Sequence, residues 1–249
     1  MTIVVTGGTK GIGLAIAEHL ARPDKALVLG YVADEAAATA ARARLERTGA
    51  RVSTFRADVG EIAGAAELMQ HAASVADGDQ THIVHSAAMI YPTSLLGADL
   101  EQFTRAIQVN GLALLYLVRA ALPLLSEGSS VVLISSAGAR TPQANYAALG
   151  VGKAMAESLV RYLVAELAPK GVRVNAVAPG LVETTSVASM LGSEEAAARL
   201  FERAARANPS GRLTRDRDYA AVVEFLLSPA AAFVQGQVIH VNGGAYVPA

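Results

Sequence analysis

The chain has 249 residues, no cysteine, a formal net charge of -1 at pH 7 and a sequence pI near 6.5. The lack of cysteine excludes disulfides, zinc–thiolate sites and thiol nucleophiles, and the balanced charge does not favour nucleic acid or acidic membranes as partners. Hydrophobic residues make up 52% of the chain, enough for a core on both faces of a sheet. We therefore expect one α/β domain over residues 1–249 with no metal site, and a cytoplasmic location because no export signal is visible.

The first elements are a strand, a glycine-rich turn and a helix. Ile3–Val5 forms the strand, Thr6–Gly13 the turn, and apolar residues recur at helical spacing from Leu14. Glycines let the backbone approach a pyrophosphate, and a helix amino end offers free N–H groups and a favourable dipole. This order favours a dinucleotide site over a purely structural turn.

The residues after the second strand bear on the choice of cofactor. The strand Ala26–Leu29 is followed by Gly30-Tyr31-Val32, and the first acidic residue is Asp34. An NAD-dependent enzyme usually has an acidic residue earlier, to bind the ribose 2'-hydroxyl. Lys10 lies in the glycine turn, within reach of a 2'-phosphate, although it can also be a solvated loop lysine. Together these features favour NADPH.

The middle of the chain carries four polar residues with open interpretations. Asp58 follows the strand 51–55 and can accept from the adenine amino group or cap the next helix. His82 and His85 lie in the next strand and are interpreted as structural, because neither an orienting acid nor a metal partner is near. Asn110 lies in a predicted helix over about 100–125, where its amide must bind the backbone or a water.

The residues that suggest reaction chemistry follow the apolar strand Val131–Ile134. Ser135-Ser136 stands at its carboxyl end, and Tyr146 and Lys153 are predicted on one helix beginning at Asn145. Seven residues are nearly two turns, so both side chains share a face about 10 Å apart along the axis. The ammonium would lower the pKa of the phenol and make it a general acid. The alternative is a packed tyrosine and a solvated lysine.

After Pro179-Gly180, at the end of the strand predicted over 172–177, the helical periodicity weakens. The polar segment over about 181–215 suits a substrate lid. Within it Arg199, Arg203 and Arg206 share a helical face, which is either a solvated face or a docking surface for a phosphopantetheine arm or an acidic carrier protein. A helix over 219–227 and a strand over 237–241 complete the chain.

Taken in order, these motifs resemble the short-chain dehydrogenase/reductase family along almost the whole chain. The matching motifs are Thr6-Gly7 with Gly11-Ile12-Gly13, Asp58-Val59, Asn110, Ser135-Ser136, Tyr146 with Lys153, Asn175 with Pro179-Gly180, and Val241-Asn242-Gly243-Gly244. The resemblance implies a Rossmann-type doubly wound parallel sheet of about seven strands with helices on both faces, a nicotinamide cofactor and a homotetramer. It implies cofactor contacts from Gly7, Thr9, Lys10, Gly11, Ile12, Gly13, Tyr31, Asp58, Val59, Ala87, Asn110, Lys153, Pro179, Gly180, Val182 and Thr184.

Two departures from the usual family pattern stand out. The usual Asn-Asn-Ala-Gly after the fourth strand is replaced by His85-Ser86-Ala87-Ala88. Most members place the tyrosine four residues before the lysine, where this chain has Leu149; here Tyr146 is seven residues before Lys153 and Ser136 ten before Tyr146. This spacing is similar to that of type III enoyl-acyl-carrier-protein reductases, in which a second tyrosine often replaces Ser136.

The resemblance implies an NADPH-dependent reductase of an activated C=C bond, in an enoyl thioester or a related enone of fatty-acid or polyketide biosynthesis. Tyr146 would be the acid, Lys153 the ribose anchor and Ser136 an auxiliary donor, with a small-molecule or thioester substrate, possibly bound to acyl carrier protein. Two alternatives are a carbonyl reductase or alcohol dehydrogenase that uses the same residues, and a non-catalytic dinucleotide-binding sensor or scaffold.

Overall fold

Seven parallel strands form one sheet in the computed structural model, which describes residues 1–76, 80–184, 187 and 190–247. The strand order β3-β2-β1-β4-β5-β6-β7 confirms the predicted doubly wound architecture. The order reverses between β1 and β4, and ligands of such folds bind outside the carboxyl ends of the strands at this point. The strands are β1 (Thr2–Thr6), β2 (Ala26–Tyr31), β3 (Arg51–Arg56), β4 (Thr81–His85), β5 (Ser130–Ile134), β6 (Arg173–Pro179) and β7 (Val238–Val241).

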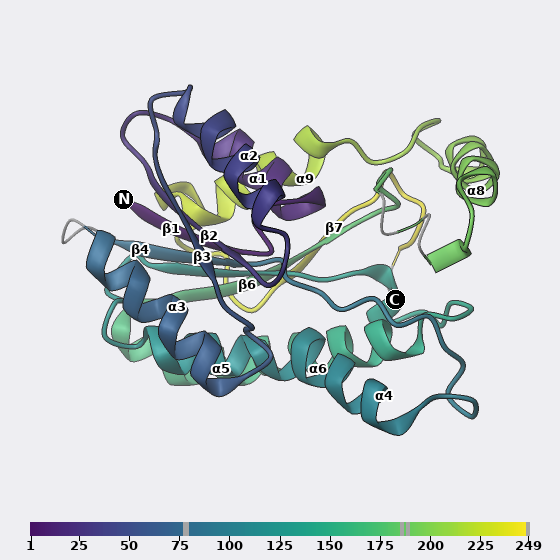
Figure 1. Ribbon diagram of the computed structural model, residues 1–249, viewed down its shortest axis with the longest axis horizontal. Coiled ribbons are helices and arrows are strands. Elements are labelled where there is room, and N and C mark those ends of the chain that lie inside the picture. The colour runs from purple at the N-terminus through teal and green to yellow at the C-terminus, as the bar shows by residue number, and fades with distance from the viewer. Residues whose placement is uncertain (77–79, 185–186, 188–189, 248–249) are drawn as a thin grey trace.

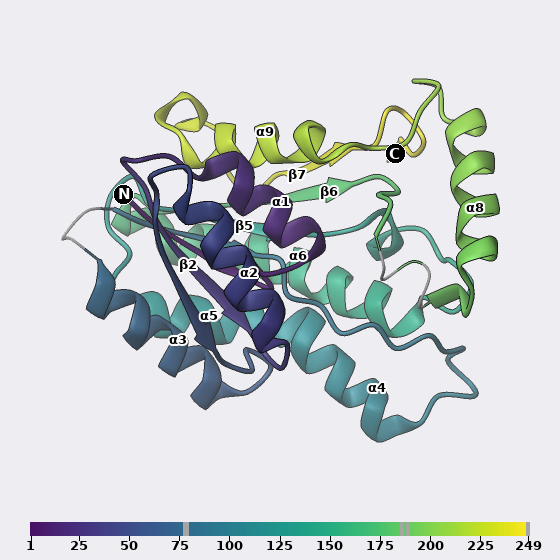
Figure 2. The ribbon, with the colours of Figure 1, turned by 45° about the horizontal axis from the view of Figure 1, so that its top comes forward.

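Helices cover both faces of the sheet (Figure 1). One face packs against α1 (Gly11–Leu20), α2 (Glu35–Glu46) and α9 (Asp216–Leu227), and the other against α3 (Ile62–Val75), α5 (Ala113–Ala121) and α6 (Ala147–Leu167). Two further α-helices of the described chain are α4 (Leu100–Ile107), which precedes α5, and α8 (Glu194–Ala207), which stands beyond the carboxyl ends of the strands (Figure 2). No described helix has the length and apolar character needed to cross a membrane.

Alternate residues of each central strand enter different cores. In β1, Val4 packs into the core beneath α3, α5 and α6, whereas Ile3 and Val5 pack into the core beneath α1 and α9. Each of these side chains is at most 1% exposed. Because both faces are covered, the central strands contain short apolar runs, such as Ile3–Val5 in β1 and Val131–Ile134 in β5, and these runs predicted the strands correctly.

The predicted helix over 100–125 is wrong in its middle. Between α4 and α5 the chain forms a π-helix, η1 (Gln108–Leu112), and α5 ends at Ala121. The Asn110 amide donates to the Met89 carbonyl and accepts from the Met89 N–H, both over 2.9 Å. These bonds hold the segment after β4 against the π-helix η1, so the hydrogen bonds of the Asn110 amide are made to the backbone. Single π turns inside α-helices are frequent near functional sites.

Arg173 joins β6 to the carboxyl end of α9. Its guanidinium donates to the carbonyls of Leu226 over 2.6 Å, Ser228 over 3.1 Å and Ala231 over 3.2 Å. The side chain is buried, and carbonyls at a helix end have no intrahelical partner. A cation there also interacts favourably with the helix dipole.

We expect Arg173→Met to lower the free energy of unfolding by about 3 kcal/mol, because three carbonyls lose a charged donor. Urea unfolding would measure the change. Arg42→Met is the control, since Arg42 is exposed and pairs with Glu46 one turn away. Equal stability of the two variants would contradict this role for Arg173.

Candidate active site

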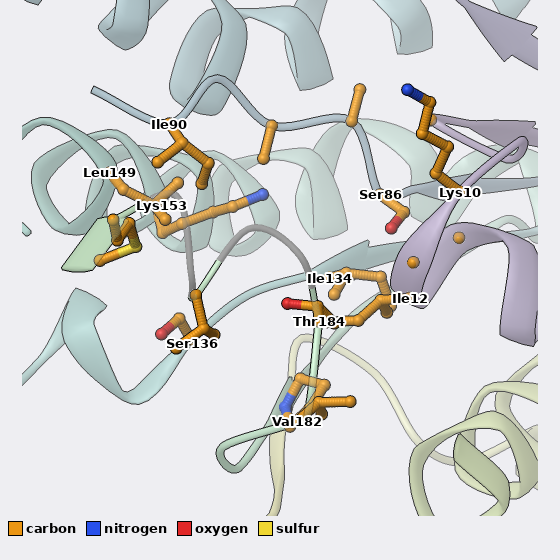
Figure 3. Close-up of a pocket in the computed structure, with 18 of the residues that line it drawn as sticks. Lys10, Ile12, Ser86, Ile90, Ile134, Ser136, Leu149, Lys153, Val182 and Thr184 are labelled. Atoms are coloured by element: carbon orange, nitrogen blue, oxygen red, sulfur yellow. The ribbon is translucent and has the colours of Figure 1, made fainter. Parts of the chain in front are cut away.

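A cavity of about 760 Å³ opens at the carboxyl ends of the central strands, where the doubly wound sheet predicts a ligand site. All three predicted catalytic residues, Ser136, Tyr146 and Lys153, line it. Figure 3 shows Lys153 extending its ammonium into the cavity and Lys10 at the opposite end. The predicted cofactor contacts that line it are Gly7, Thr9, Lys10, Gly11, Ile12, Gly13, Tyr31, Val59, Ala87, Lys153, Pro179, Gly180, Val182 and Thr184.

The hydroxyl of Thr6 ties β1 to β4 at the point where the strand order reverses. Its oxygen accepts from the N–H groups of Ser86 over 3.2 Å and Ala87 over 3.1 Å, and lies 2.8 Å from His85 Nδ1. Since both lone pairs are used, the hydroxyl hydrogen points to Nδ1, and His85 carries its proton on Nε2. Burial, with a smaller contribution from the charge of Lys153, lowers the pKa of His85 to about 3, so the ring is neutral.

The glycine turn and α1 fit a pyrophosphate. In the described part of the chain, the first turn of α1 holds no acidic residue and Lys10 makes no side-chain cap, so its N–H groups can face a ligand. A Cβ on Gly13 would lie 2.2 Å from the Gly7 carbonyl oxygen, so only glycine lets the helix start so close to the turn. The dinucleotide site predicted from this motif therefore has the geometry it needs.

Lys10 does not stand alone at the adenosine end of the cavity. It forms an ion pair with Asp34, which also lines the cavity and accepts from the Ala37 N–H as the cap of α2. The hydrogen bond with Lys10 lowers the pKa of Asp34. The sequence argument that no acidic residue is near enough to contact the cofactor is therefore wrong, because Asp34 lines the same cavity as Lys10.

Two predicted cofactor contacts are engaged elsewhere. Asp58 is not among the described residues that line the cavity; its carboxylate pairs with Arg105 and accepts from the Gly60 N–H over 3.0 Å. The alternative that Asp58 caps the next helix is wrong, because Glu61 precedes α3. Asn110 also lies behind the described lining, held by Met89.

Ser136 and Tyr146 form the polar centre of the cavity's other end. The Tyr146 hydroxyl donates to Ser136 Oγ over 3.0 Å. Tyr146 precedes α6 instead of lying on it as predicted, because Asn145 adopts a left-handed conformation with φ 57°. Asparagine tolerates this conformation better than most residues. The helix therefore starts only at Ala147, and the ring reaches the cavity from the loop.

The protonation states of Tyr146 and Lys153 follow from burial. Burial raises the pKa of Tyr146, while its hydrogen bond with Ser136 acts in the opposite direction. The expectation that the phenol has a lowered pKa is therefore wrong for the protein alone, and the hydroxyl keeps its proton at neutral pH. Burial lowers the pKa of Lys153 to about 8. A protonated phenol is the form that a proton donor requires.

The substrate end of the cavity is apolar and partly formed by the segment predicted as a lid. Thr184 and Leu200 come from this segment, and Leu200 belongs to α8. The apolar residues at this end are Ile90, Leu149, Val187, Met190, Leu191 and Leu200. Among the described lining residues, Lys10, Asp34 and Lys153 carry the charges, and no group of potential metal ligands was found in the described chain.

The arginine row predicted from sequence lies on α8 away from the polar centre. Arg199, Arg203 and Arg206 border a shallow hollow together with Glu202, and Arg206 pairs with Glu202. Sequence reasoning missed Ile90 and Asp34 as lining residues, whereas Leu200 belongs to the predicted lid and Leu149 is identified only as the residue in the usual tyrosine position. The end of a predicted strand indicates that the residues directly after it line the cavity. A side chain that reaches the cavity from a loop distant in sequence has no such local pattern.

Comparisons with known proteins agree with this geometry. A family model described as Enoyl-(Acyl carrier protein) reductase matches residues 7–246. The chain belongs to the short-chain dehydrogenase/reductase family. It is 36% identical over 244 residues to cis-4-hydroxycyclohexanecarboxylate dehydrogenase of Sinomonas cyclohexanicum, covering 97% of this chain and 94% of the relative.

Two further similarities cover almost the whole chain. NADPH-dependent aldehyde reductase 2 of Arabidopsis thaliana, a chloroplastic protein, is 32% identical over 255 residues, covering 97% of this chain and 92% of the relative. A short-chain dehydrogenase of Burkholderia cenocepacia in complex with NADP has a TM-score of 0.86 and 27% identity, covering 98% and 96% of the two chains. The protein is thus an oxidoreductase of a family that uses NAD(P).

The low pKa of Lys153 predicts a pH-dependent stability. Between about pH 8 and its ordinary value of 10.5, the unfolded chain holds a proton that the folded protein has released, so the free energy of unfolding rises with pH. Relative to Lys153→Met, in which this titration is absent, we expect the wild type to gain about 2 kcal/mol between pH 7 and pH 10. Urea unfolding of both proteins at each pH would measure it. A constant difference would contradict a buried, titrating Lys153.

Proposed function

We propose that the protein reduces an activated C=C bond, in an enoyl thioester or a related enone, with NADPH as the hydride donor. The observation that carries the proposal is the position of the acid. Leu149 lines the cavity four residues before Lys153, where most members of the family have their tyrosine, and the phenol comes instead from Tyr146. The acid is therefore displaced by three residues along the chain.

This displacement suits conjugate reduction. In carbonyl reduction the carbon that accepts hydride and the oxygen that needs stabilisation are bonded, so the acid and the nicotinamide act on adjacent atoms. In conjugate reduction hydride goes to the β-carbon, and negative charge develops on an oxygen three bonds away. Because the phenol reaches the cavity from the loop before α6, and not from the helical position four residues before Lys153, it would act at a point that accommodates the longer reach.

In this reaction the residues that line the cavity would each have a separate role. Bound in the cavity, the cofactor supplies a hydride. Lys153 would hold its ribose, and the glycine turn its pyrophosphate. Tyr146 would release Ser136, donate its hydrogen bond to the substrate oxygen and stabilise the enolate. Tyr146 would then give its proton to the enolate, which ends with that proton on the α-carbon, and the phenolate would regain a proton from water, so that one hydride and one proton add across the double bond.

The apolar end of the cavity supports a substrate with a hydrocarbon body. The side chains of Ile90, Leu149 and Leu200 offer no charged group to bind. A thioester borne on a carrier would enter beside α8, where Arg199 and Arg203 would face an acidic partner. A free enone would need no such contact.

Carbonyl reduction or alcohol oxidation is the second candidate. The relatives named as an aldehyde reductase and a hydroxycyclohexanecarboxylate dehydrogenase support it, since both names describe chemistry at a C–O bond. The same Ser136, Tyr146 and Lys153 could serve that reaction. The two candidates differ in which substrate atom receives the hydride.

The test is NADPH oxidation with crotonyl thioester and with acetoacetyl thioester, and identification of the products by mass spectrometry and NMR. We expect turnover of the crotonyl thioester, and loss of orders of magnitude in kcat in Tyr146→Phe with little change in NADPH affinity. Turnover of the acetoacetyl thioester alone would favour the second candidate. NADPH binding with neither substrate reduced would favour a dinucleotide sensor.

The ion pair between Lys10 and Asp34 predicts how cofactor choice responds to charge. Lys10→Ala should raise KM for NADPH roughly tenfold, equivalent to about 1.4 kcal/mol, and leave KM for NADH nearly unchanged. Asp34→Asn should lower KM for NADPH, because the phosphate no longer competes with a carboxylate. Lys170→Ala is the control, since Lys170 is exposed and lies in the 3-10 turn that follows the carboxyl end of α6, outside the described cavity lining. A parent enzyme that prefers NADH would overturn the assignment of NADPH.

A further inference from the structure

A single buried carboxylate closes the short turn that carries Ser136. Ser135 Oγ donates to Glu157 Oε1 over 2.6 Å, and Arg140 Nε donates to Glu157 Oε2 over 3.0 Å. Ser135 and Arg140 flank the 3-10 turn η2 (Ala137–Ala139), so one side chain holds both of its ends. Glu157 is 3% exposed and lies one turn beyond Lys153, on the same face of α6.

Gly138, inside this turn, lies in close contact with the ring of Tyr146. A Cβ at this position would lie 2.4 Å from Tyr146 Cε1 and 2.6 Å from Cδ1. The Gly138 N–H donates to Ser136 Oγ over 3.2 Å, the same oxygen that accepts from the Tyr146 hydroxyl. The turn therefore contacts the tyrosine at its ring edge and, through Ser136, at its hydroxyl.

The helix completes the support on the other side. A Cβ on Gly150 would lie 2.6 Å from the Gly138 carbonyl oxygen, so α6 packs directly on the turn. Asn145, in its left-handed conformation, accepts through its carbonyl from the Thr93 N–H over 3.2 Å. The Tyr146 backbone is thus fixed from the loop after β4, while its ring is fixed from the turn after β5.

We propose that Glu157 and Gly138 are positioning residues for Tyr146: the Glu157 carboxylate fixes the turn, and Gly138 seats the phenol ring so that its hydroxyl meets Ser136 and the substrate oxygen. This inference rests on the proposed role of Tyr146 as proton donor, but not on which substrate bond is reduced. The Arg140 side chain is 37% exposed, and an ion pair that solvent reaches on one side contributes little net stability. The pair of Glu157 and Arg140 is therefore better explained by the geometry it imposes.

The first test is Gly138→Ala. A methyl group at this position pushes the ring by about 1 Å to restore ordinary contact distance, and a shift of that size lowers rates by about a hundredfold. We expect kcat to fall to that extent on whichever thioester the wild type reduces, with the Kd for NADPH within twofold of wild type. Gly97→Ala is the control, since a Cβ there meets only the Ser94 hydroxyl at 3.0 Å within the described chain.

The second test keeps the proposal falsifiable if Gly138→Ala unfolds the turn. In Glu157→Gln the amide still accepts from Ser135 but presents a poor partner to Arg140, and we expect about a tenfold loss of kcat. Glu224→Gln is its control, because the Glu224 carboxylate also contacts two side chains, His19 and Arg22, and is not among the described residues that line the cavity. A kcat within twofold of wild type in both Gly138→Ala and Glu157→Gln would overturn the proposal.

A Tyr146→Phe background separates positioning from general stability. If both residues act through the phenol, neither variant lowers the residual activity of Tyr146→Phe by more than about twofold. Full additive losses in that background would assign them a structural role and overturn the proposal. Wild-type activity in Tyr146→Phe itself would instead remove the proposed function, so the two failures are distinguishable.

Discussion

The hydroxyl of Thr6 is the contact on which the arrangement of the site depends. It lies where β1 and β4 separate, and in one position it accepts two backbone N–H groups and donates to His85. These bonds fix the end of β4 relative to the glycine turn that follows β1. The cofactor cradle, the segment after β4 and the wide turn at Asn110 are all positioned from this junction.

The free-energy cost of burying a charged group determines the protonation of Lys153 and Tyr146, at the catalytic end of the cavity. Lys153 is 4% exposed, and burial lowers its pKa accordingly. A phosphate-bearing cofactor supplies the negative charge and ribose hydroxyls that such an ammonium lacks in the protein alone. Tyr146 is affected in the opposite sense, because burial keeps it protonated. A Lys153 with a lowered pKa and a protonated Tyr146 both suit a site in which the bound cofactor and substrate supply the missing polar partners.

The sequence predicted the parts of the fold that depend on local pattern. Ile3–Val5 and Val131–Ile134 are apolar runs of strand length, and the glycines from Gly7 to Gly13 fit a strand–turn–helix unit. These features fixed the sheet, the cradle and the position of Ser136. The family resemblance supplied the roles of Tyr146 and Lys153, whose spacing is visible in the chain itself.

What the sequence could not give are contacts between residues distant along the chain. The pairing of Lys10 with Asp34 spans two elements, and the clamp of Glu157 on Arg140 joins a helix to a turn. The break in the helix at Asn110 depends on Met89, and the left-handed Asn145 on its neighbours. Hydrophobic spacing predicts none of these contacts. It indicates which face of a helix or strand is buried, but not which partner a polar side chain on that face will have.

The central claim is that the displaced phenol directs hydride to the β-carbon. A single acyclic enone, incubated with NADPH deuterated at the transferred position, offers the protein both sites in one molecule, and NMR of the product locates the label. The account predicts a saturated ketone with deuterium on the β-carbon. An allylic alcohol with deuterium on the carbinol carbon would contradict it.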